Sequence, residues 1–120
     1  MVRKAVTATQ VRTALLQLDA EPNGTALGTR DLVRTTLRWL AQQNPGHTVE
    51  IRVPPFAAVQ AVDGPRHTRG TPPNVVEMDA ETWLELVAGR STWAEAVSSG
   101  RINASGLRAD LSALLPLTRP

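Results

Sequence analysis

Two arginines and a histidine lie close together in the middle of the chain. Arg66, His67 and Arg69 fall within four residues, and prolines flank them on both sides. Guanidinium groups bind carboxylates and phosphates through paired hydrogen bonds, and prolines restrict the conformations of a loop. We therefore expect the loop of residues 65–74 to hold an anionic group. The alternative is an ordered surface loop that hydrogen-bonds its own backbone.

The other groups that perform chemistry in proteins are missing or lack partners. The chain has no cysteine, which excludes disulfides, thiolate metal sites and a cysteine nucleophile. His47 and His67 are the only histidines, and neither has a second ligand at metal-binding spacing. The serines have no nucleophile-elbow motif and the glycines no phosphate-loop pattern. We expect no metal, no cofactor and no catalytic residue, with a cofactorless enzyme working through His67 and Arg69 as an alternative.

Three further arginines recur every four residues in a stretch with helical periodicity. Arg30, Arg34 and Arg38 form one ridge, and Asp31 is placed to pair with Arg34. We expect a solvated helix face, with contact to phosphates or an anionic membrane as the alternative. The 13 basic and 11 acidic residues give a net charge of only +2, and 3% of residues are aromatic. Both values argue against a nucleic-acid partner.

The length and the hydropathy pattern limit the number of domains and the cellular locations that are possible. The 120 residues fit a single domain spanning positions 1–120. No apolar run approaches the roughly 20 residues of a membrane span, and the N-terminal stretch lacks a secretory signal. We expect a cytoplasmic protein without stable membrane insertion. Heavy use of Arg and Ala with a single Lys indicates a GC-rich genome.

Hydrophobic periodicity predicts an α+β protein. Helices are expected after Thr7, which forms a capping box with Gln10, and after Thr29 as N-cap. Two more are expected after the caps Asp79 and Thr92, and a last one over Leu107–Leu115 before Pro116. Pro54-Pro55 marks a bulge or an edge between two strands. The predicted strands are Thr48–Val53, Phe56–Val62, Val75–Met78 and Arg101–Ala104.

The last third of the chain resembles the sterol carrier protein type 2 family. Gly89-Arg90, Gly100-Arg101 and Gly106 stand at that family's spacings, among strands and helices in its order. The loop 65–74 looks like that of small, stand-alone actinobacterial members and departs from the animal proteins. The resemblance implies about five strands in a mixed sheet, helices on one face, and an apolar tunnel between them. Such a tunnel binds a fatty acid, acyl thioester or sterol-like lipid without chemistry.

Apolar stripes on the predicted helices and strands supply candidates for the wall of such a tunnel. Arg66, His67 and Arg69 are the candidates for its mouth, where the head group of a fatty acid needs charged donors. A filled core made by the same apolar side chains is an equally good interpretation. A further alternative is an interaction module that docks on a protein partner through the loop 65–74. The candidate wall residues are Leu37, Leu40, Val59, Trp83, Val87, Trp93, Val97, Leu111 and Leu115.

Overall fold

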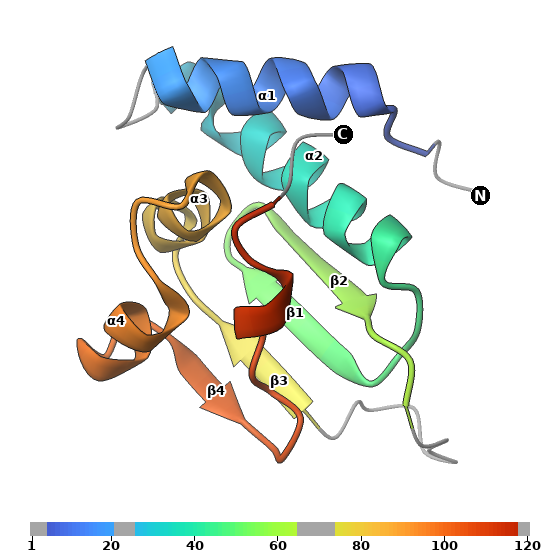
Figure 1. The fold of residues 1–120 in the computed structure, drawn as a ribbon, viewed down its shortest axis with the longest axis vertical. Coiled ribbons are helices and arrows are strands. Elements are labelled where there is room, and N and C mark those ends of the chain that lie inside the picture. The colour runs from blue at the N-terminus through green and yellow to red at the C-terminus, as the bar shows by residue number, and fades with distance from the viewer. Residues whose placement is uncertain (1–4, 21–25, 65–73, 118–120) are drawn as a thin grey trace.

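Over the residues that it describes, the computed structural model contains four strands, four α-helices and one 3-10 turn (Figure 1). The structure describes residues 5–20, 26–64 and 74–117. The loop that carries Arg66, His67 and Arg69 therefore lies outside the described residues. In chain order the elements are α1 (Ala8–Ala20), α2 (Ala26–Gln43), β1 (Val49–Val53), β2 (Ala57–Ala61), β3 (Asn74–Glu77), α3 (Ala80–Ala88), α4 (Trp93–Ser98), β4 (Asn103–Ser105) and η1 (Ser112–Leu114).

The sheet is mixed, in the order β2-β1-β3-β4. β1 pairs with β2 antiparallel and with β3 parallel, and β4 closes the other edge antiparallel to β3. The predicted α+β class is confirmed. The described residues contain four strands rather than about five, and the chain after β4 runs as an irregular segment.

Helices cover one face of the sheet, as the alternation in β1 predicts. Ile51 and Val53 are fully buried, whereas Arg52 between them is exposed. α2 packs on β2, and α1 and α3 pack on α2, so α1 forms an outer layer (Figure 1). The opposite face carries Glu50, Gln60 and Glu77 beside Arg52, and of these four side chains Arg52 and Gln60 are exposed and the two glutamates half-buried.

The helix starts follow the predicted caps with one exception. Thr7 and Gln10 exchange backbone and side-chain hydrogen bonds at 2.8 and 3.1 Å, which confirms the capping box of α1. Asp79 caps α3, and Thr92 with Glu95 forms the capping box of α4. The prediction that Thr29 caps α2 is wrong, because the helix already starts at Ala26. Gly28 inside the first turn costs only about 1 kcal/mol, which tertiary packing of a long helix overcomes.

The proline pair makes a hairpin turn rather than a bulge. Phe56 N–H donates to the Val53 carbonyl at 3.0 Å, and the ladder starts at once with Val53 opposite Ala57. Neither Pro54 nor Pro55 has an N–H to pair, so both fit a turn that leads from the inner strand β1 into the edge strand β2.

The predicted last helix is wrong. Residues 106–117, here termed the C-terminal segment, contain only the 3-10 turn η1, and Leu107 is fully exposed. The Asp110 carboxylate accepts from Ser112 N–H at 2.8 Å, a local bond that competes with helical pairing. The more extended path places Ala109 and Leu111 in the core.

Candidate functional site

Five of the predicted wall residues meet in the centre of the molecule. None of them is more than 1% exposed, and all belong to one hydrophobic cluster between the sheet and the helices. In the resting structure they therefore pack against neighbouring side chains, as the filled-core interpretation predicts. This set, here termed the interior site, is Leu37, Leu40, Trp83, Val87 and Leu111.

A polar bridge crosses the interior site. The Trp83 indole Nε1–H donates to the Thr36 hydroxyl oxygen at 2.9 Å, and that hydroxyl donates to the Leu32 carbonyl at 2.7 Å. Thr36 and Trp83 are both fully buried. The bridge fixes the indole of α3 against α2 and satisfies its only polar atom, as a buried tryptophan requires.

The other predicted wall residues lie at the margin of the interior site or away from it. Val59, Trp93 and Leu115 are half-buried and pack against the hydrophobic cluster. Val97 was predicted to face inward, but it is 46% exposed. α4 has only six residues and buries Ala96, so the next residue, turned by about 100°, faces solvent.

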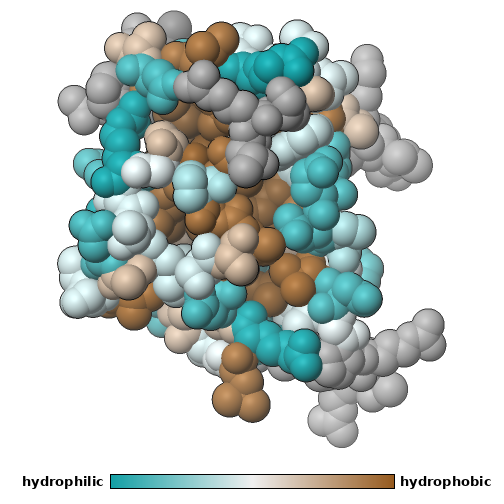
Figure 2. Space-filling view, in the orientation of Figure 1, coloured by the Kyte–Doolittle hydropathy of each residue, from teal (hydrophilic) through white to brown (hydrophobic). Residues whose placement is uncertain are grey.

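The C-terminal segment covers the interior site between α2 and α3. Near its start the Arg108 N–H donates to the Asn74 side-chain oxygen at 2.9 Å, and at its end the Leu117 N–H donates to the Val87 carbonyl at 3.2 Å. Asn74 is itself buried and donates to the Thr48 carbonyl. Apolar side chains gather across the middle of this face, where the segment crosses the sheet (Figure 2). The interior site is therefore covered by an irregular strip of chain rather than by a helix.

The two glycine-arginine pairs have structural roles that the sequence did not reveal. A terminal nitrogen of Arg90 donates to the Leu18 carbonyl in the last turn of α1. Arg101 donates to Glu85 of α3 at 2.7 Å and to the Ser99 hydroxyl at 2.9 Å. Both guanidiniums tie helices together, and their spacing after a helix-ending glycine is the only sequence signal for this.

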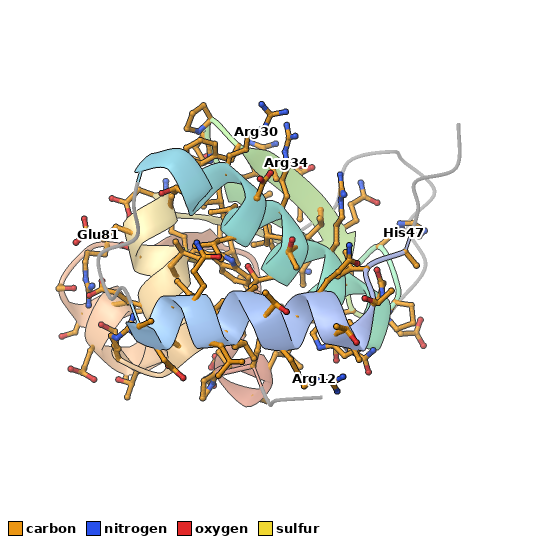
Figure 3. The ribbon with its side chains drawn as sticks, turned by 90° about the horizontal axis from the view of Figure 1, so that it is seen from above. Arg12, Arg30, Arg34, His47 and Glu81 are labelled. Carbon is orange, nitrogen blue, oxygen red and sulfur yellow. The ribbon has the colours of Figure 1, made fainter. Side chains whose placement is uncertain are left out.

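A second candidate site lies between α2 and the edge strand β2. A hollow of about 190 Å³, here termed the edge hollow, is lined by Arg34, Arg38, Phe56, Ala57, Ala58 and Val59. The Arg34 Nε–H donates to the Phe56 carbonyl at 3.2 Å. The predicted pairing of Arg34 with Asp31 is wrong, because Asp31 lines a groove on the α1 side of the helix. Figure 3 shows Arg30 and Arg34 on the side of α2 turned away from α1.

The three arginines of α2 that were predicted to form one ridge therefore differ in exposure. Arg30 is exposed as predicted for a solvated face, whereas Arg34 and Arg38 are half-buried against β2. Among the described residues, neither Arg34 nor Arg38 pairs with a carboxylate. The four-residue spacing predicts the ridge but not which members meet the sheet.

Two carboxylates have pKa values lowered by local hydrogen bonds. The Thr92 hydroxyl and backbone N–H hold the pKa of Glu95 below its usual value. The Ser112 backbone N–H and hydroxyl do the same for Asp110. Both groups belong to a cap or a turn, so their shifts have structural explanations. In the described part of the chain, no three acidic or histidine side chains gather as metal ligands would, and no helix is long and apolar enough to span a bilayer.

The fold and its apolar centre define a class: small α+β proteins whose helices cover one face of a mixed sheet. The chain belongs to the family described as bacterial SCP ortholog, where SCP stands for sterol carrier protein, and the match spans residues 27–117. The resemblance predicted from residues 78–106 is confirmed and extends to α2 and the sheet. α1 lies outside the matched range. A comparison with curated proteins finds no match.

Proposed function

We propose that the protein binds and carries an apolar ligand, without chemistry, in the interior site beneath the C-terminal segment. The observation that carries this proposal is the family match over residues 27–117, because lipid binding or carrying is what SCP-like proteins do in general. The ligand classes that suit the site are a fatty acid, an acyl thioester or a sterol-like lipid.

The way the interior site is covered supports the proposal. An acyl chain enters it by displacing the C-terminal segment, which exposes Ala109 and Leu111 and breaks the bonds from Arg108 and Leu117. Burying a chain of sixteen carbons stabilises the complex by about 12 kcal/mol before ordering costs, at ~0.8 kcal/mol per methylene. That gain exceeds the cost of about 2 kcal/mol for exposing Leu111, to which the exposure of Ala109 and the loss of two hydrogen bonds add about 1 kcal/mol each.

The chemistry of the described residues also favours binding over catalysis. His47, the one histidine among them, hydrogen-bonds Gln60 at 2.7 Å on the open face of the sheet. The interior site contains apolar side chains and the Thr36–Trp83 bridge, in which the hydroxyl is already committed to a carbonyl. An enzyme working through His67 and Arg69 is the competing proposal, and ligand turnover in the presence of the protein tests it.

The loop 65–74 remains a proposed second element of the function. Arg66, His67 and Arg69 are one candidate site for the anionic head group, and in the alternative they dock on a protein partner. Changing Arg66 and Arg69 to Gln removes charge but retains polarity. A head-group role predicts weaker binding of a fatty acid with unchanged binding of the matching alcohol, whereas a docking role predicts no change for either ligand.

Native mass spectrometry of protein purified without detergent tests the carrier function. We expect a species heavier than the polypeptide by the mass of one lipid, which denaturation releases and extraction identifies. After delipidation, the protein should take up an added fatty acid at one molecule per chain. A bare polypeptide mass in both experiments overturns the proposal.

A further inference from the structure

We propose that the edge hollow is the site that holds the anionic head group of the ligand, through Arg34 and Arg38 of α2. This inference deepens the proposed carrier function and rests on it. It identifies the ligand class as a long-chain carboxylate rather than a neutral sterol. It also places the head group at the β2 edge of the helix layer.

The first support is the state of the two guanidiniums. Both arginines are half-buried, and among the described residues neither has a carboxylate partner. The Arg34 Nε–H is held by the Phe56 carbonyl at 3.2 Å, which leaves the two terminal nitrogens of that group available for an anion. Partly desolvated guanidiniums gain more from a carboxylate than fully exposed ones do, because water screens the charges less.

The second support is a comparison with Arg52 on the other side of the same turn. A hollow of about 300 Å³ there shares Phe56, Ala57 and Ala58 with the edge hollow, and Arg52 and Glu77 also line it. Arg52 is paired with Glu50, and Glu77 stands opposite it on β3. The carboxylates of Glu50 and Glu77 repel an added anion. The side of the turn at the edge hollow therefore favours an anion, whereas the side at Arg52 disfavours one.

The third support is the path from the edge hollow to the interior site. Val59 lines the hollow and is half-buried, and its register partner Ile51 is fully buried on the same inner face of the sheet. On α2, Leu37 lies next to Arg38 in sequence and is fully buried in the interior site. A carboxylate held by Arg34 and Arg38 therefore lies at the rim of the layer in which the acyl chain is proposed to lie.

Paired binding measurements with hexadecanoate and hexadecanol test the assignment. Arg38→Gln and the double variant Arg34→Gln/Arg38→Gln should weaken hexadecanoate binding about tenfold or more and leave hexadecanol binding unchanged. Arg38 donates no hydrogen bond within the described structure, so its single variant reports on the ligand and not on the fold. Arg30→Gln removes the same charge one turn before Arg34, outside the hollow, and should leave both affinities unchanged.

The other outcomes separate this site from the function on which it rests. Equal weakening of both ligands, or of neither, overturns the edge hollow as the head-group site while the carrier function stands. Selective loss of hexadecanoate in Arg66→Gln/Arg69→Gln but not in Arg38→Gln also overturns it and assigns the head group to the loop 65–74. If the unmodified protein binds neither ligand, the carrier function fails and this site fails with it.

Discussion

Residues 79–105 and the C-terminal segment are held in place in different ways. In the first region the helices are capped. Asp79 is the N-cap of α3, Gly89 is its C-cap at a φ of +79°, and a capping box starts α4. Arg101, which precedes β4, pairs with Glu85 of α3. The C-terminal segment has one 3-10 turn and is anchored to the sheet and to α3 by backbone N–H groups near its two ends.

The contrast indicates where the protein opens. A region fastened by caps, an ion pair and the Thr36–Trp83 bridge loses several interactions together if it moves. The C-terminal segment loses few hydrogen bonds, the burial of Ala109 and Leu111, and the partial burial of three leucines, Leu114, Leu115 and Leu117. Segments with fewer buried contacts and hydrogen bonds open at lower free energy, so ligand entry is expected under the C-terminal segment.

The largest effect is expected from a substitution that prevents the C-terminal segment from packing on the core. Leu111→Asp places an unpaired carboxylate at a site that is 1% exposed. This should cost several kcal/mol of a total stability of about 5 to 15 kcal/mol, and should unfold the domain or abolish ligand uptake. Denaturant unfolding measures the loss. Leu107→Asp, at a fully exposed position of the same segment, is the matched control and should leave the unfolding midpoint unchanged.

Removing the Thr36–Trp83 bridge tests how much it stabilises the packing of α3, in the region of residues 79–105, against α2. Thr36→Val keeps the shape of the side chain but leaves the buried Trp83 N–H without a partner. The free energy of unfolding should fall by about 1 to 3 kcal/mol. Thr35→Val is the control, because Thr35 is half-buried in the groove beside α1 and is not part of the bridge. Equal effects of the two changes would show that the bridge does not stabilise the fold.

A smaller effect is expected at the start of α4. Thr92→Ala removes the hydroxyl that accepts from Glu95 N–H at 3.1 Å and should cost about 1 kcal/mol. Ser98→Ala, at an exposed position at the other end of α4, controls for loss of a hydroxyl. Unfolding curves that do not separate the two variants would mean that the capping box adds nothing to stability.

The smallest effect concerns the turn within the C-terminal segment. The pKa of Asp110 is lowered in the folded protein by the Ser112 N–H and hydroxyl, so its stabilising contribution is present above the usual pKa of about 3.9 and is lost as the pH falls below it. Asp110→Asn keeps an acceptor without a charge. The protein should therefore be more stable than this variant at about pH 6, and the difference should shrink as the pH falls below the usual pKa of the carboxyl. Asp63→Asn, at another exposed carboxylate, is the control, and a pH-independent difference contradicts the assignment.

Local signals in the sequence predicted much of the fold. The capping boxes at Thr7 and Thr92 and the alternation over Val49–Val53 depend on neighbouring residues, and the structure confirms them. The last helix was wrongly predicted because its leucines have helical spacing, whereas the Asp110–Ser112 turn and the demands of the core decide the path. Apolar spacing predicts burial without telling a filled core from a ligand site.

The site could be predicted only in part, because its contacts join residues that are distant in the sequence. The period of four placed Arg30, Arg34 and Arg38 on one ridge, but the packing of α2 against β2 decides which of them are half-buried. Arg90 and Arg101 have partners on helices distant in sequence, Leu18 and Glu85, and the glycine that precedes each arginine does not indicate which partner it meets.

The most direct test of the carrier account follows Trp83 alone. In Trp39→Phe/Trp93→Phe the remaining indole lies in the interior site and is 0% exposed. Titration with a fatty acid brominated along its chain measures how closely the chain approaches that indole. The account predicts saturable quenching that ends at one ligand per chain and is reversed by the unbrominated acid. A folded protein whose Trp83 emission stays unquenched, or falls linearly without saturation, would contradict it.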